Sequence, residues 1–146
     1  MASKYPDKVK SLITIGGGAY PRPNGAEDFL PESLISKSDT GFIEDMKLRH
    51  CEAHKGDWQT YLRKTVSDWQ SHPNLTEEEW NAIKCPALFI NGENDPFGTC
   101  AELQEKVSGA NVYEVKNAGH RPHFVGEQVE EINTTMLEFL DAIDKN

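Results

Sequence analysis

Residues 86–92 read Pro-Ala-Leu-Phe-Ile-Asn-Gly, a short apolar run that begins with a proline and ends with a glycine. Such a run predicts a buried strand that leads into a loop. Two further runs, VKSLITI at residues 9–15 and NVYEV at residues 111–115, have the same character. Helical patterns separate the three runs along the chain. Strands that alternate with helices predict an α/β fold with a short, mainly parallel sheet of about three strands.

The helical patterns are clearest between residues 41 and 83. One apolar face repeats at helical spacing and comprises Trp58, Tyr61, Leu62, Thr65, Val66 and Trp69. We expect a preceding helix over residues 41–54, and the sequence Thr76-Glu77-Glu78-Glu79 matches a capping box at a helix start. Pro21, Pro23, Asn24, Gly25 and Pro31 interrupt residues 19–40, which therefore predict a loop. Two more helices are expected, one over residues 100–108 and one along the C-terminal apolar stripe.

Composition narrows the class of protein. The chain has 146 residues, which suits one domain, and a net charge of -9, which disfavours nucleic acid as a partner. No apolar run is long enough to cross a membrane, and the first residues lack an apolar signal region. Three cysteines without close pairing indicate free thiols. From these features we expect a cytoplasmic protein that does not bind membranes.

Two loops carry residues suited to proton transfer. Asp95 follows the strand at residues 86–92, and His120 follows the strand at residues 111–115. The carboxyl ends of parallel strands lie at one edge of a sheet, so the two side chains can meet there. The aspartate would orient the imidazole, and the histidine would act as a general base. The alternative is that Asp95 only shapes a turn before Pro96 and that His120 merely follows a flexible glycine.

These two motifs resemble the C-terminal half of an α/β-hydrolase. The resemblance rests on IKCPALFINGENDPFG at residues 83–98, on NVYEVKNAGHRPHF at residues 111–124, and on a terminal amphipathic helix. It implies a partial α/β-hydrolase fold with its core at residues 1–18 and 84–146 and a helical cap at residues 19–83. It also implies a catalytic acid at Asp95, a catalytic histidine at His120, hydrolysis of a small ester-like substrate, and neither cofactor nor metal.

One part of the family pattern is missing. The family carries its nucleophile in G-x-S-x-G, ahead of the acid and the histidine, and that motif does not occur here. By resemblance the nucleophile should lie before Met1, so we expect the chain alone to be inactive. Three alternatives stay open: a truncated or fragmentary product, a hydrolase completed by a second polypeptide, and a non-catalytic binding or interaction module.

Residues inside the chain offer weaker alternatives. Ser3 and Ser11 lack a strand-turn-helix elbow, whereas Cys100 lies near the expected edge and would need activation by a histidine. Gly16-Gly17-Gly18 is compatible with an oxyanion or phosphate loop, but a flexible strand exit is the simpler interpretation. The remaining candidates are His50 and His54 as a metal pair on one helix, His123 as a pocket rim, and Trp58, Trp69 and Trp80 as cap core or pocket lining.

The strand at residues 9–15 leads to a further expectation. By resemblance its neighbour on one side is absent, so it would present unpaired backbone groups. Only Lys8 and Lys10 add charge to this segment, and no proline interrupts it. We therefore expect a homo-oligomer that forms through the exposed sheet edge.

Overall fold

The computed structural model describes residues 1–22, 24–124, 126 and 128–145. These residues form two compact units, of which the first comprises residues 1–20 and 75–146 and the second comprises residues 21–74. Each unit is described below by itself. Within the described residues, no helix combines the length and the apolar character that a membrane span requires.

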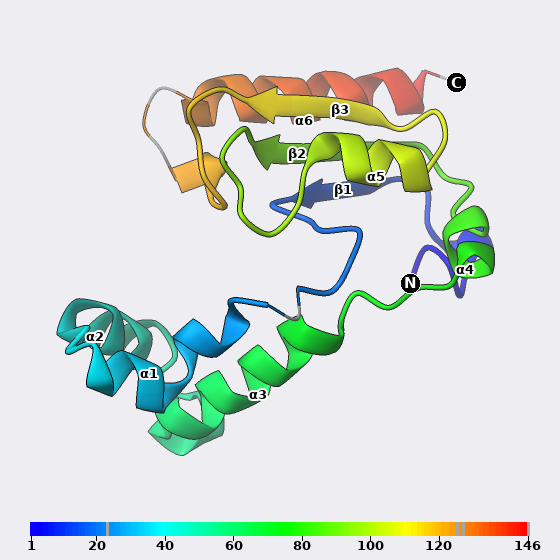
Figure 1. The fold of residues 1–146 in the computed structure, drawn as a ribbon. Helices are drawn as coiled ribbons and strands as arrows, with labels where there is room; N and C mark the ends of the chain where they lie inside the picture. The colour runs from blue at the N-terminus through cyan, green and yellow to red at the C-terminus, as the bar shows by residue number, and fades with distance from the viewer. Residues whose placement is uncertain (23, 125, 127, 146) are drawn as a thin grey trace. The chain divides into compact units, whose positions relative to one another are not determined.

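The first unit contains a three-stranded parallel sheet in the order β1-β2-β3 (Figure 1). The strands are β1 (Leu12–Ile15), β2 (Ala87–Gly92) and β3 (Asn111–Val115). Every residue of β2 is buried, as expected for a strand with neighbours on both sides and helices on both faces. This sheet confirms the predicted α/β class and the predicted number of strands.

Two helices cover opposite faces of the sheet. On one face, α5 (Cys100–Lys106) packs Leu103 against Phe89 of β2. On the other face, α6 (Gln128–Asp144) packs Ile132 against Ile90. The two faces alternate along β2, because successive side chains of a strand point to opposite sides.

The short helix α4 (Glu77–Asn81) begins at the predicted capping box. Glu79 N–H donates to Thr76 Oγ1 at 3.2 Å, and Thr76 N–H donates to Glu79 Oε2 at 3.0 Å. Trp80 of this helix packs in the same apolar cluster as Leu103 and Val107. Residues 75–83, which the sequence pattern assigns to the helical insertion, therefore group with the sheet, and Trp80 is not part of the core of that insertion.

The second unit is helical. It contains α1 (Pro31–Ser36), α2 (Thr40–Arg49) and α3 (Trp58–Ser71), with 3₁₀ turns at Ala26–Phe29 and Ala53–Gly56. Leu62 and Val66 of the predicted α3 stripe are buried, and Trp58 and Tyr61 pack beside them half-exposed. Trp69 meets the ring of Phe29 edge-on at a centroid distance of 5.5 Å. The stripe therefore faces the interior of this unit, as its spacing predicts.

Several boundaries differ from the sequence prediction, and one of them is the end of α5 at Lys106 rather than at residue 108. Helix α1 lies within the expected loop at residues 19–40, because Pro31 occupies the first helical position, where a missing N–H costs nothing. Helix α2 ends at Arg49 rather than residue 54, and His54 and Lys55 have positive φ angles of 49° and 59°. Strand β1 begins at Leu12 because Val9 ends a 3₁₀ turn at Pro6–Lys8.

Candidate active site

Asp95 and His120 meet at the edge of the sheet where the strands end. Asp95 lies three residues beyond Gly92, and His120 lies five residues beyond Val115. His120 Nδ1 is 3.2 Å from both Oδ1 and Oδ2 of Asp95. The Asp95 side chain is completely buried, whereas 41% of the His120 side chain is exposed. With the carboxylate as acceptor, Nδ1 carries the proton and Nε2 is left to accept one.

Two further groups surround the carboxylate of Asp95. Phe97 N–H donates to Oδ1 at 2.9 Å, and Asn91 Nδ2 lies 3.4 Å from Oδ2. The ring of Phe97 also packs against the imidazole of His120, with centroids 4.6 Å apart. A buried carboxylate needs such donors to stay ionised. The loop therefore stabilises the anion and restrains the histidine.

Hydrogen bonds tie the loop that carries Asp95 to the loop that carries His120. Asn94 N–H donates to Ala118 O at 2.9 Å, and Glu93 N–H donates to Val115 O at 2.9 Å. Asn117 N–H donates to the carboxylate of Glu93 at 3.0 Å, and this bond is the main reason why the pKa of Glu93 is lowered. The spacing between acid and histidine thus rests on the main chain of both loops.

Two glycines allow these loops to approach closely. A Cβ at Gly92 would lie 2.2 Å from Gly119 O, far inside contact distance. A Cβ at Gly16, whose φ is +68°, would lie 2.6 Å from His120 O. The Gly16-Gly17-Gly18 segment after β1 is therefore a close packing partner of the histidine loop, in keeping with the simpler interpretation of a strand exit.

The internal candidates for a nucleophile do not lie beside His120. Ser3 and Ser11 precede β1, so they lie toward the start of the strand and not toward its end. Cys100 is buried, and its Sγ lies 3.6 Å from the carbonyl oxygens of Phe89 and Tyr113. Burial raises the pKa of the Cys100 thiol, which opposes formation of a nucleophilic thiolate.

The other histidine candidates have neighbours of their own. His50 stacks on Tyr61 with centroids 4.2 Å apart, and His54 lies beyond the end of α2. They do not share a helix face, so the metal-pair hypothesis loses its geometric basis. His123 packs against Phe124. Among the described residues, no three His, Cys, Asp or Glu side chains are grouped so that they could hold a metal ion.

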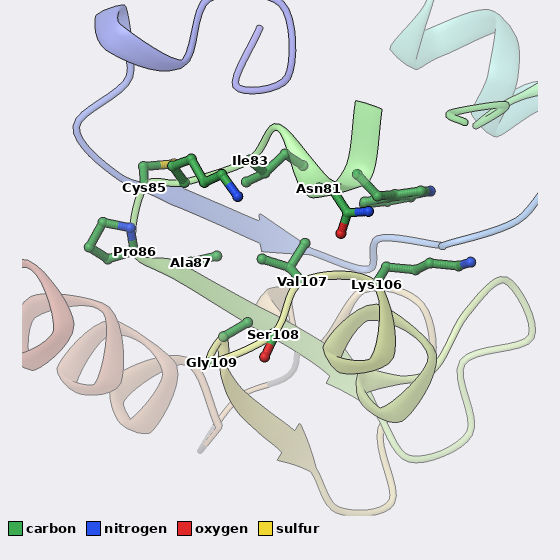
Figure 2. A pocket seen from close by; sticks show the side chains of 12 residues that line it. Asn81, Ile83, Cys85, Pro86, Ala87, Lys106, Val107, Ser108 and Gly109 are labelled. Atoms are coloured by element: carbon green, nitrogen blue, oxygen red, sulfur yellow. The ribbon is translucent and has the colours of Figure 1, made fainter. Parts of the chain in front are cut away.

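A hollow of about 390 Å³ lies at the other end of the strands, where β2 and β3 begin (Figure 2). Its lining comes from α4, from the start of β2 and from the turn between α5 and β3, and includes Cys85, Lys106 and Ser108. Lys106 Nζ is already paired with Glu77. Neither Asp95 nor His120 contributes to this lining, so the hollow is separate from the candidate site.

Sequence reasoning did not single out Asn91, which contacts Asp95 from within β2. A usable signal was present, because Asn91 is the one polar side chain in the run Ala87–Gly92. A polar residue inside a fully buried strand is uncommon unless its hydrogen bonds are satisfied.

Comparisons with known proteins agree with the α/β fold described above. Residues 7–133 match the alpha/beta hydrolase family. The enol-lactonase from Burkholderia xenovorans superposes with a TM-score of 0.64 and 22% identity over 96% of this chain and 59% of that chain. A thermophilic esterase superposes with a TM-score of 0.68 and 20% identity, over 97% of this chain and 60% of the esterase chain. A carboxylesterase of the thaumarchaeon Nitrososphaera gargenis superposes with a TM-score of 0.69 and 17% identity, over 99% of this chain and 60% of that chain.

The chain thus spans about three fifths of the length of these solved structures. Among curated proteins, none matches the sequence.

Proposed function

The chain belongs to the alpha/beta hydrolase family, and we propose that it supplies the acid and the histidine of a catalytic triad that hydrolyses a small ester-like substrate. The observation that carries this proposal is the contact of 3.2 Å between His120 Nδ1 and the buried carboxylate of Asp95. Esterases and a lactonase among the structural neighbours support the same reaction class.

In the proposed mechanism, Asp95 holds the imidazole in the tautomer with the proton on Nδ1. Nε2 of His120 then takes the proton of the attacking nucleophile as a general base. The nucleophile attacks the ester carbonyl carbon, and the imidazolium, stabilised by the adjacent carboxylate, gives its proton to the leaving alcohol as the ester C–O bond breaks. The acyl group is then bound to the nucleophile. In the second half of the reaction, His120 takes a proton from a water molecule, which attacks the acyl carbon, and the acid leaves as the imidazolium returns the proton to the nucleophile.

We further propose that the nucleophile and the oxyanion-hole amides come from polypeptide outside these 146 residues. The sequence holds no G-x-S-x-G, Ser3 and Ser11 precede β1, and Cys100 is buried against the carbonyl oxygens of Phe89 and Tyr113. The family order of nucleophile, acid and histidine places the missing residue ahead of Asp95. On this proposal the 146 residues alone are inactive, and the helical unit of residues 21–74 serves as the cap.

The test has two arms. In the first, the 146-residue chain is incubated with p-nitrophenyl acetate and with a fluorophosphonate probe, and we expect neither turnover nor labelling, because nucleophile and oxyanion hole are absent. Labelling of one residue that is lost in His120→Ala would contradict the absence of an internal nucleophile. Labelling of Cys100 would identify that nucleophile.

In the second arm, the genomic sequence upstream of the Met1 codon is read, and any continuous frame that encodes G-x-S-x-G is expressed together with these residues. The longer protein should hydrolyse p-nitrophenyl acetate, and Asp95→Asn and His120→Ala should each lower kcat by about 10³–10⁴-fold. His54→Ala, at an exposed histidine of the helical unit, is the matched control. Absence of such a frame would leave a nucleophile from a second polypeptide or a non-catalytic binding module. Full activity in both variants would contradict the catalytic roles of Asp95 and His120.

A further inference from the structure

Asn91 carries a polar amide at a position of the buried strand β2 where an aliphatic side chain is usual. It is 0% exposed and follows Leu88, Phe89 and Ile90 in the central strand. Burial of an amide is costly unless hydrogen bonds replace those made to water. An aliphatic side chain would avoid that cost, so the hydrogen bonds of this amide call for an explanation.

The surroundings of Asn91 fix the orientation of its amide. Nδ2 lies 2.7 Å from Gly17 O, 2.9 Å from Gly98 O and 3.4 Å from Asp95 Oδ2. All three neighbours only accept hydrogen bonds, so the NH₂ group must face them. Asn91 Oδ1 is buried and has no hydrogen-bond partner among the described residues. The side chain is therefore used as a donor alone.

The two short bonds join the exits of two strands. Gly98 closes the loop that begins at Gly92 and carries Asp95, so its bond to Asn91 sets the span of that loop. Gly17 belongs to the segment after β1, in which Gly16 lies against His120. The longer contact to Oδ2 directs the same NH₂ group at the carboxylate itself.

We propose that Asn91 is a positioning residue, which holds the buried carboxylate of Asp95 at hydrogen-bond distance from His120 Nδ1 and thereby sets the tautomer of His120. It acts through Asp95 and makes no contact with a substrate. The inference rests on the proposed pairing of Asp95 with His120. It assigns a role to a side chain of the strand, where the family pattern considered above names only residues of the loops.

The tautomer of His120 can be read in the 146-residue chain without any nucleophile. Long-range ¹H–¹⁵N correlation spectra at about pH 9, where an ordinary imidazole is neutral, distinguish a proton on Nδ1 from a proton on Nε2. We expect the Nδ1–H form in the wild type. Asn91→Leu keeps the branched shape but replaces the polar atoms with larger methyl groups, and Asn91→Asp keeps the shape but loses the amide donors. Both should shift His120 mainly to the Nε2–H form that imidazoles prefer in water.

Two control variants are measured in the same way, one that should lose the Nδ1–H form and one that should keep it. Asp95→Asn should abolish the Nδ1–H preference, because it replaces the acceptor. Gln104→Leu removes another amide-to-carbonyl bond, from Gln104 Nε2 to Ala110 O at 3.2 Å, at a distance from His120. That variant should lower stability without changing the tautomer. A purely structural role for Asn91 would give the same outcome as Gln104→Leu.

The outcomes separate the two ideas. If both Asn91 variants retain the wild-type tautomer while Asp95→Asn loses it, the positioning role is wrong and the pairing of Asp95 with His120 stands. If Asp95→Asn also retains the tautomer, the pairing fails, and the role of Asn91 fails with it.

Should the Asn91 variants not fold, the wild-type amide itself provides the measurement. Its two Nδ2 protons should exchange far more slowly than those of the exposed Asn133, and their resonances should move in Asp95→Asn. Exchange as fast as that of Asn133, or resonances that do not respond to Asp95→Asn, would overturn the proposal.

Discussion

At the scale of single residues, the phenol of Tyr113 shows how strongly this fold perturbs a side chain. Tyr113 lies on β3 and packs half-buried against the apolar cluster under α6. Removal from water, followed by a hydrogen bond to Glu131 and the charge of that carboxylate, raises the pKa of Tyr113 to about 12. The folded chain thus holds this proton more tightly than the unfolded chain, in which a tyrosine has a pKa of about 10.

The raised pKa of Tyr113 predicts a loss of stability at high pH. The stabilisation is fully present below about pH 10 and is lost as the pH rises toward about 12, because over that range only the unfolded state gives up the proton. The difference in unfolding free energy between wild type and Tyr113→Phe should therefore fall across this range, as measured by denaturant titration. Glu131→Gln should move the tyrosinate absorbance change to lower pH. A difference that stays constant from pH 10 to 12 would contradict the assignment.

The candidate site was predictable to different degrees, residue by residue. Asp95 and His120 could be paired from sequence because each follows a strand, and parallel strands end at a common edge. Asn91 could not be assigned in the same way, because its partners Gly17 and Gly98 are backbone carbonyls. Every residue has a backbone carbonyl, so the sequence does not show which carbonyl accepts a hydrogen bond from Asn91, and only the folded structure does.

At the scale of elements, local signals decided which predictions succeeded. The capping box at Thr76 depends on residues only three apart, and the structure contains both of its hydrogen bonds. The end of α2 depends instead on how the chain must turn toward α3, which the apolar pattern of residues 41–54 does not encode. The identity of Pro31 alone does not say whether it is first or central in a helix, so the pattern of residues 19–40 predicts a loop where α1 forms.

The cap at Thr76 predicts a measurable contribution to stability. Thr76→Ala removes the oxygen that accepts Glu79 N–H and should lower the unfolding free energy by about 0.5–2 kcal/mol. The loss should be seen in the unfolding of the first unit, because α4 places Trp80 in the apolar cluster beneath α5. Chemical denaturation monitored by tryptophan fluorescence is the measurement. Thr76→Ser is the matched control and should stay near wild type. An unchanged midpoint in Thr76→Ala would show that α4 does not need its cap.

At the scale of the whole molecule, the sheet has an open edge at β1. The N–H groups of Leu12 and Gly16 donate to Pro86 O and Ile90 O of the neighbouring β2. Because alternate residues of a strand point to opposite sides, the N–H of Ile13 points away from β2. Within the part of the chain that the structure describes, no strand pairs with this side. Unpaired edges of this kind favour association with another strand.

We therefore predict that the 146-residue chain self-associates through β1. Light scattering after size-exclusion chromatography should show a dimer or larger species that dissociates on dilution. Ile13→Pro removes the outward N–H and should weaken association while the pairing of Leu12 and Gly16 with β2 remains. Ile13→Val keeps the N–H and is the control. A monomer at every concentration, or an assembly that Ile13→Pro leaves unchanged, would refute the prediction.

The division into a discontinuous and a continuous unit has a consequence for synthesis on the ribosome. Residues 21–74 are contiguous and carry their own apolar cluster around Leu34, Ile43, Met46 and Leu62, so they are complete before β2 has been translated. Strand β1 is made before this unit, yet its partner residues in β2 begin at Ala87, opposite Leu12. The nascent chain must therefore hold β1 without its β2 partner while the whole helical unit is made. During this interval a transiently exposed strand edge of this kind is prone to association with other chains.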